Sequence, residues 1–169
     1  GRNSFEHYSV ISQLTEMAGL QDSTILIAPT YPIQGDIDEH NLGDDILYWP
    51  DIDWNAGNLS RSTQSNPRPF RISAFSTLDT IYHRLVENNS GLEKIILTGH
   101  SAGSQMVVRY AAGGRGQGGV VDESIELLYV PVNTPSFLYY DGYRVVDQNA
   151  EMFDFGPTNC ASANQYKYG

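Results

Sequence analysis

The sequence predicts an α/β fold with three layers, in which a parallel sheet carries helices on both faces. Three short apolar runs rich in β-branched residues have the composition of buried parallel strands; they cover residues 24–29, 94–98 and 124–132. Between these runs lie two stretches whose apolar residues recur at helical spacing. Strands that are joined through helices run parallel, because the connection has to cross back over the sheet. We therefore expect one parallel sheet with helical cover.

The length and composition fit a single globular domain over residues 1–169. Of the 169 residues 40% are hydrophobic and 18% are charged, so the chain can build a core and does not resemble a disordered segment. Its net charge of −10 argues against nucleic acids and anionic membrane surfaces as partners, since both attract basic residues. No apolar run approaches the ~18 residues of a membrane-spanning helix. The single cysteine, Cys160, leaves no internal disulfide framework and no cysteine-based zinc site, and we expect no metal or cofactor.

The first elements are a helix, a strand and a long irregular segment. Residues 4–18 repeat apolar side chains at helical spacing, and Gly19 follows as the end of the helix. The strand at 24–29 closes at a proline. Residues 30–72 show no sustained period and form a lid-like excursion, of a length that is usually functional or mobile. Its aromatic residues, which include Trp49 and Trp54, either line or cover a pocket or pin a surface excursion in place.

The second half of the chain predicts a helix, a glycine-rich loop and a strand. An apolar stripe that starts near Ser73 or Ser76 and ends at Asn88 predicts the helix, and His83 lies off this stripe. Residues 113–119 include the spacing Gly-x-Gly-x-x-Gly, but this spacing follows a helix where a dinucleotide site requires a preceding strand, so we expect a flexible loop. After the strand at 124–132, a turn is predicted at 133–136, and the tail shows no periodic element.

Five residues, Gly99-His100-Ser101-Ala102-Gly103, connect the middle strand to the helix that follows it. They match Gly-x-Ser-x-Gly, the nucleophile elbow, in which a serine occupies a sharp strand-to-helix turn. The context strengthens the match, because the run at 94–98 precedes it and a helical stretch follows until Gly113. A side chain at either Gly99 or Gly103 is expected to crowd the junction of strand and helix. The alternative is an ordinary glycine- and serine-containing turn.

On this motif and its flanks, the chain resembles the α/β-hydrolase superfamily, of the serine esterase or lipase-like kind. The runs at 25–28, 95–98 and 125–132 are similar to strands four, five and six of that fold, and residues 1–3 with the helix after them are similar to the segment after strand three. In that fold strand three lies between strands four and five. The resemblance therefore implies that this chain is the middle of a hydrolase. The remaining strands, and the part that carries the acid and the histidine, are then expected elsewhere in the polypeptide or in a second polypeptide.

The resemblance also implies a role for individual residues. Ser101 would be the nucleophile that attacks an acyl carbonyl, and the backbone N–H of Ala102 would be one donor to the oxyanion. Arg2 and Asn3 stand where that fold has its oxyanion loop, and either is a possible second donor or simply a loop residue.

The base that activates the serine is not found in the expected place. The order along the chain in this fold is serine, acid, histidine, whereas all four histidines here precede Ser101; they are His7, His40, His83 and His100. His100 is adjacent to the serine, and adjacent side chains on such a turn point apart. The sequence therefore predicts a base from outside residues 1–169 and identifies no acid.

Two functions from different classes follow from the sequence. In the first, the chain is part of a serine hydrolase that cleaves an ester or related acyl bond of a small molecule, and acyl transfer to an alcohol or amine would use the same residues. In the second, it is a non-catalytic, hydrolase-like module that binds a partner or helps to build an assembly. Two N-glycosylation sequons, at Asn58 and Asn88, favour a secreted protein over a cytoplasmic one.

Overall fold

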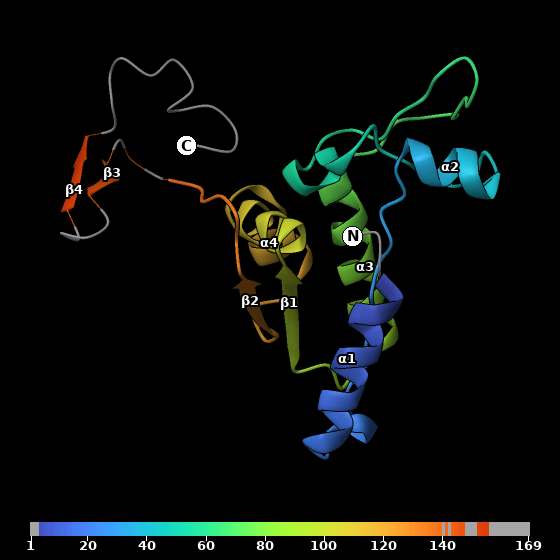
Figure 1. Cartoon of the computed structure of the whole chain (residues 1–169). Helices are drawn as coiled ribbons and strands as arrows, with labels where there is room; N and C mark the ends of the chain where they lie inside the picture. The colour runs from blue at the N-terminus through green and yellow to red at the C-terminus, as the bar shows by residue number, and fades with distance from the viewer. Residues whose placement is uncertain (1–3, 140, 142, 148–151, 156–169) are drawn as a thin grey trace. The chain divides into compact units, whose positions relative to one another are not determined.

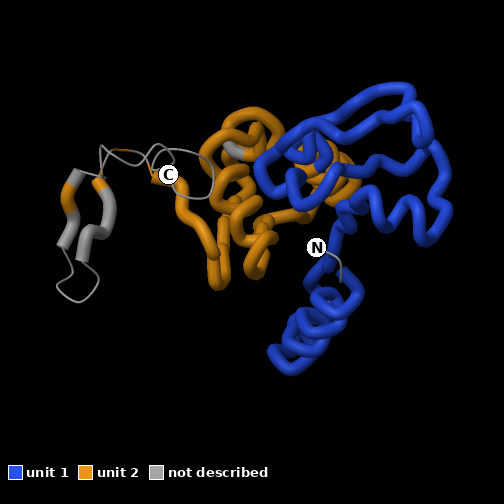
Figure 2. The backbone as a smooth tube through the Cα atoms, turned by 45° about the horizontal axis from the view of Figure 1, so that its top comes forward, with its two compact units in different colours: residues 1–77 blue, residues 78–169 orange. Residues whose placement is uncertain are grey.

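The computed structural model describes residues 4–139, 141, 143–147 and 152–155. The chain divides into two compact units, Gly1–Thr77 and Leu78–Gly169, which Figure 2 shows in blue and orange. The elements along the chain are labelled in Figure 1. Helices and a small parallel sheet make this a mixed α/β protein, as the sequence predicts at that level.

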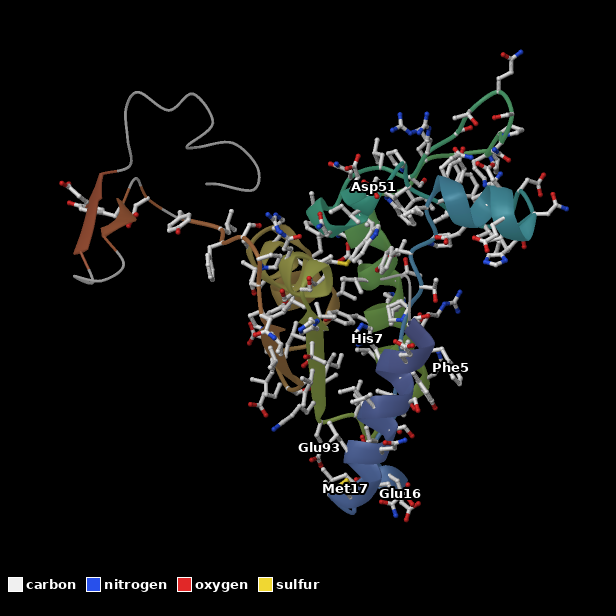
Figure 3. The ribbon with its side chains drawn as sticks, viewed as in Figure 1. Phe5, His7, Glu16, Met17, Asp51 and Glu93 are labelled. Carbon is white, nitrogen blue, oxygen red and sulfur yellow. The ribbon has the colours of Figure 1, made fainter. Side chains whose placement is uncertain are left out.

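Unit 1 begins with helix α1 (Ser4–Met17), which the sequence predicts at this place. The helix ends at Gly19, whose φ of 68° is left-handed and whose N–H donates to the carbonyl of Glu16 at 2.9 Å. No residue of α1 is buried, and the side chains of Phe5 and Met17 stand off the ribbon in Figure 3 with 78% and 84% of their surface exposed. The apolar stripe that predicted the helix is therefore uncovered within the described residues.

The strand predicted at residues 24–29 does not form. A short 3₁₀ turn, η1 (Gln21–Ser23), is followed by backbone without strand pairing, and Ile25 and Ile27 are 57% and 46% exposed. A β-branched run becomes a strand only where a neighbouring strand satisfies its backbone and covers its side chains. Within the described residues this run has no such neighbour, and the prediction of a buried strand is wrong for this structure.

The rest of unit 1 folds around three aromatic rings. The ring of Tyr31 stacks on Trp54 at a centroid distance of 5.2 Å and meets Trp49 edge-on at 5.3 Å. All three side chains are buried, and the indole N–H of Trp49 donates to the carbonyl of Asn58 at 2.8 Å. Both tryptophans thus belong to the core of the unit. Of the two roles that the sequence left open for them, their burial matches the one in which they hold the irregular segment in place. Two short elements frame this core, α2 (Gln34–His40) and η2 (Ile52–Ala56).

Helix α3 (Ala74–Asn88) starts where the chain passes from unit 1 to unit 2. The hydroxyl of Ser73 accepts a hydrogen bond from the N–H of Phe75 at 3.1 Å and so caps the helix. The helix therefore begins at the earlier of the two predicted starts. In unit 1, the phenol of Tyr31 is hydrogen-bonded to the hydroxyl of Thr77 in the first turn of α3 at 2.9 Å. Burial raises the pKa of the Tyr31 phenol to about 12, although the bond to Thr77 acts in the opposite direction.

The sheet of unit 2 pairs β1 (Lys94–His100) with β2 (Glu126–Val132) in parallel, in the register Lys94↔Glu126 to His100↔Val132. Both strands are predicted by the sequence. Helix α4 (Ala102–Gly113) connects them together with a π-helical turn, η3 (Gly116–Val120), and packs against both strands. Figure 1 shows the two strands side by side.

The two faces of this sheet differ in burial. Ile95 on β1 points to the α4 side and is buried, whereas Ile96 on the opposite face is 55% exposed. The same opposite face continues on β2 with side chains that are 36% to 43% exposed; they are Leu128, Val130 and Val132. Helical cover of this second face, which a three-layer fold requires, remains a prediction.

The C-terminal turn of α4 is anchored by tyrosine side chains. The phenol of Tyr110 donates to the carboxylate of Asp79 at 2.6 Å, and its ring meets Tyr82 edge-on at 5.7 Å. Burial, together with the Asp79 carboxylate, raises the pKa of the Tyr110 phenol. The loop predicted to be flexible also packs closely here, because a Cβ on the buried Gly116 would lie 3.0 Å from the Tyr82 ring and 3.2 Å from Leu127.

A second, antiparallel sheet follows in the tail. It pairs β3 (Tyr143–Asp147) with β4 (Met152–Phe155), where the sequence showed no periodic element. The two segments are short and rich in aromatic and β-branched residues, which are features of strands that a search for periodicity overlooks.

Candidate active site

The predicted strand–turn–helix is observed, with Ser101 at its corner. Strand β1 ends at His100, helix α4 begins at Ala102, and Ser101 between them has φ 55° and ψ −116°. A residue with a side chain rarely adopts a positive φ, and holding it there costs about 1–3 kcal/mol. Ser101 is exposed at the carboxyl end of the strand. The turn therefore presents a serine hydroxyl outward on a strained backbone.

Gly99 permits this corner, because strand and helix approach closely at that point. A Cβ on Gly99 would lie 2.5 Å from the carbonyl carbon and oxygen of Gly103 and 2.9 Å from the nitrogen of Ser104. No side chain fits at such distances without moving the backbone. A Cβ on Gly103, by contrast, would meet nothing within 4 Å. The expected crowding is therefore confirmed at Gly99 and is wrong at Gly103, where the described residues leave open space.

Three hydrogen bonds fix the peptide groups on either side of Ser101. Its N–H donates to the carbonyl of Val132 at 3.0 Å, which ties the corner to the end of β2. Its carbonyl accepts the N–H of Gln105 at 3.2 Å and the hydroxyl of Ser104 at 2.5 Å. Ser104 is fully buried and Ser101 is exposed, so this second bond is partly shielded from water. The strained conformation is thus held by partners on β2 and on α4.

The start of α4 offers N–H groups next to the serine. The first N–H groups of a helix have no partner inside the helix, and the helix dipole makes this end attractive to negative charge. Ala102 is the first residue of α4, so its N–H meets the chemical requirement for an oxyanion donor beside Ser101. Arg2 and Asn3, the predicted oxyanion loop, lie outside the described residues.

Neither histidine of unit 2, His83 or His100, is hydrogen-bonded to Ser101. Within the described part of the chain, the Ser101 hydroxyl makes no hydrogen bond to any side chain. His100 is adjacent to Ser101 in the chain, but its Nε2 is hydrogen-bonded to the side-chain nitrogen of Asn133 at 3.0 Å. His83 is exposed on α3 and pairs with Glu87 at 3.0 Å, as expected of a surface residue. The other two lie in unit 1, His7 on α1 and His40 at the end of α2.

The loop after β2 contributes residues that the sequence did not single out. Asn133 has a φ of 50° and follows β2 at the position next to Ser101 in the parallel register. Three residues later Ser136 is buried, and its hydroxyl oxygen accepts from Gln105 at 2.6 Å and from Arg109 at 3.1 Å. Both donors belong to α4, so the loop is fastened to the helix that follows the elbow. The available signal was an asparagine directly after a strand, since asparagine tolerates the left-handed region.

No protein-family model, no curated protein sequence and no solved structure matches the chain. In the residues that can be described, no three histidine, cysteine, aspartate or glutamate side chains come together as metal ligands. Over the same residues, every helix is too short or too polar to cross a bilayer.

Proposed function

We propose that this chain carries the nucleophile of a serine hydrolase of the α/β-hydrolase kind, which cleaves an ester or a related acyl bond. The observation that carries the proposal is the backbone of Ser101, at φ 55° and ψ −116° between a parallel strand and a helix. A conformation that costs about 1–3 kcal/mol persists only where the surrounding structure enforces it, and such residues cluster at functional sites. The close approach of Gly99 to Gly103 and the hydrogen bonds to Ser101 supply that enforcement.

The proposed chemistry follows from the groups at the corner. The Ser101 hydroxyl oxygen forms a bond to the acyl carbon while its proton passes to a base, and the Ala102 N–H stabilises the oxyanion that forms. The carbon–oxygen bond of the ester then breaks, and the base returns the proton to the departing alcohol. Water repeats the sequence on the acyl-serine, which releases the acid and restores the hydroxyl.

The base and the acid are proposed to lie outside the described residues. A serine hydroxyl is a weak nucleophile without a base in hydrogen-bond reach, and here none is found among the described side chains. The same proposal places further strands and a helix against β1 and the exposed face that contains Ile96 and Val130. Parallel sheets are almost always covered on both faces, which supports this part.

A fluorophosphonate probe tests the proposal on the intact protein, because it forms a covalent bond only with an activated serine. We expect one adduct, located at Ser101 by mass spectrometry and lost in Ser101→Ala. The matched control is Ser90→Ala, which removes an exposed loop serine and is expected to label as the natural protein does. An intact, folded protein that takes up no probe would contradict the proposal.

The second candidate is a non-catalytic module that binds a partner or helps to build an assembly. It is favoured by one observation, namely that within the described residues the Ser101 hydroxyl is hydrogen-bonded to no histidine. In that case the probe leaves the natural protein unlabelled, and Ser101→Ala behaves as the natural protein in every assay. Labelling at Ser101 would exclude this candidate.

A further inference from the structure

Unit 1 contains an open hollow of about 420 Å³ that belongs to no part of the elbow. Its lining combines a few apolar groups with four polar side chains, among them two arginines; the residues are Pro50, Asp53, Asn58, Leu59, Arg61 and Arg71. Three of the chain's ten basic residues lie between positions 61 and 71, in a protein of net charge −10. A local concentration of positive charge in such a chain calls for an explanation.

The two arginines of the hollow extend from paired backbone segments. Leu59 and Ser73 form an antiparallel bridge, and Arg61 and Arg71 each lie two residues beyond it, one on each segment. The N–H of Ser60 donates to the carbonyl of Ile72 at 2.7 Å, which fixes the two segments against each other. The Nε of Arg71 donates to the carbonyl of Ser60 at 2.7 Å. The Arg71 guanidinium is therefore held at the hollow by one nitrogen, with its outer two nitrogens left to meet a ligand.

Neither of these arginines forms an ion pair with another described residue. Among the described residues, no carboxylate lies within 4.0 Å of either guanidinium, although the chain has 20 acidic residues. Asp53 lines the same hollow but stays beyond that distance. Like charges at facing positions of an antiparallel pair repel each other and destabilise it. Two cations that share an open space and have no carboxylate within 4.0 Å have the composition of an anion site.

We propose that the hollow binds the oxyanionic group of a small molecule, a carboxylate or a phosphate, between Arg61 and Arg71. The planar guanidinium presents its N–H groups as a fork that matches two oxygens of such a group, so two arginines can hold it from two sides. Asp53 restricts the site, because its negative charge in the lining weakens the attraction for any anion. This site is independent of Ser101 and of the proposed hydrolase activity.

Titration with inorganic phosphate and, separately, with acetate tests the site, at an ionic strength kept constant with sodium chloride. NMR follows the arginine Nε–H signals and the two indole N–H signals, since Trp49 and Trp54 adjoin Pro50 and Asp53 in the chain. We expect saturable shifts with one anion or with both, and the responding anion identifies the group that the hollow accepts. If neither phosphate nor acetate gives a saturable shift, the proposal is overturned.

Variants locate the binding. Arg61→Gln and Arg71→Gln are each expected to weaken it at least about 10-fold, since each removes a charged hydrogen-bond partner. Arg61 is the safer variant for folding, because no hydrogen bond of its side chain is found in the described residues. Arg84→Gln, an exposed arginine on α3, makes the same change of net charge and is expected to bind as before. Equal binding in all three variants would place the anion elsewhere and overturn the proposal.

Asp53→Asn gives a test of opposite sign. Removal of the one carboxylate that lines the hollow is expected to tighten binding about 3-fold, because it removes repulsion between like charges. No surface arginine elsewhere would produce this gain. An unchanged or weaker affinity in Asp53→Asn would show that the anion does not sit in this hollow.

Discussion

Unit 1 holds an irregular backbone around a buried aromatic core, whereas unit 2 uses regular elements to hold one serine in an unfavourable conformation. In unit 1, residues 30–72 owe their path to Trp49, Trp54 and Tyr31, which bury large rings against one another. In unit 2, the position of Ser101 depends on a missing side chain at Gly99 and on backbone hydrogen bonds.

The difference shows that the two units respond to opposite kinds of substitution. A core of large rings is weakened when atoms are removed, because the neighbours cannot close the cavity that is left. A close backbone contact is weakened when atoms are added, because there is no space for them. Three tests, each with its own variants, sharpen this contrast, and their expected effects fall from the first to the third.

Trp49→Ala is expected to have the largest effect. Trp49 is 1% exposed, contacts Tyr31 and donates a hydrogen bond to Asn58, so its truncation leaves a cavity and an unpaired carbonyl. We expect a loss of about 3–5 kcal/mol in the free energy of unfolding, measured by urea denaturation with circular dichroism. Phe70→Ala is the control, since Phe70 is 61% exposed and its loss should cost less than about 0.5 kcal/mol. Similar losses in both variants would contradict the role given to the aromatic core.

Gly99→Ala and Gly103→Ala separate the two glycines of the elbow. The methyl group at position 99 would lie 2.5 Å from backbone atoms, so we expect a loss of about 1–3 kcal/mol in stability and little labelling of Ser101 by a fluorophosphonate. At position 103 the added methyl meets open space on a helix, where alanine is favoured over glycine by up to about 1 kcal/mol. Thermal unfolding and labelling of the two variants give the comparison. If Gly103→Ala is the more damaged protein, a segment outside the described residues covers that position.

Ionisation of Tyr31 is expected to lower the free energy of unfolding of unit 1 at alkaline pH. Because burial raises the pKa of its phenol to about 12, the folded state keeps a proton that the unfolded state loses near pH 10. The stabilisation that the protonated Tyr31 phenol gives the folded state is therefore complete below pH 10. It is lost as the pH rises toward 12, and about 1.4 kcal/mol of the free energy of unfolding is lost at pH 11. Urea unfolding at pH 9 and at pH 11 measures the difference between the natural protein and Tyr31→Phe. The phenylalanine variant has no phenol to ionise, so an equal loss in both proteins would assign the effect to other groups.

The parts of the structure that the sequence predicts are those with local causes. The elbow is predicted because a sharp turn after a strand requires glycine at a fixed position, and Gly99 meets that requirement visibly. Helices α1 and α3 are predicted because their apolar spacing and their ends, Gly19 and Ser73, can be identified along the chain. These signals need no knowledge of distant residues.

The parts that it does not predict depend on distant partners. Ile25 and Ile27 have the composition of a strand, but strand formation needs a second segment, and none pairs with them in the described residues. The clamp on Ser136 requires Gln105 and Arg109, which lie on another element and show no pattern that links them. The sequence identifies no base for Ser101 for the same reason, because the position of a histidine in space does not follow from its place in the chain.

The hydrogen bonds that shape Ser101 come from a short, contiguous stretch of chain. The partners of its backbone, Val132, Ser104 and Gln105, all lie on α4 or at the end of β2. The conformation of the corner therefore depends on this stretch of chain. All three partners belong to unit 2, so an insertion in the segment before α3 removes none of these hydrogen bonds. An evolving chain could then vary what surrounds this hydroxyl while inheriting the hydroxyl itself unchanged.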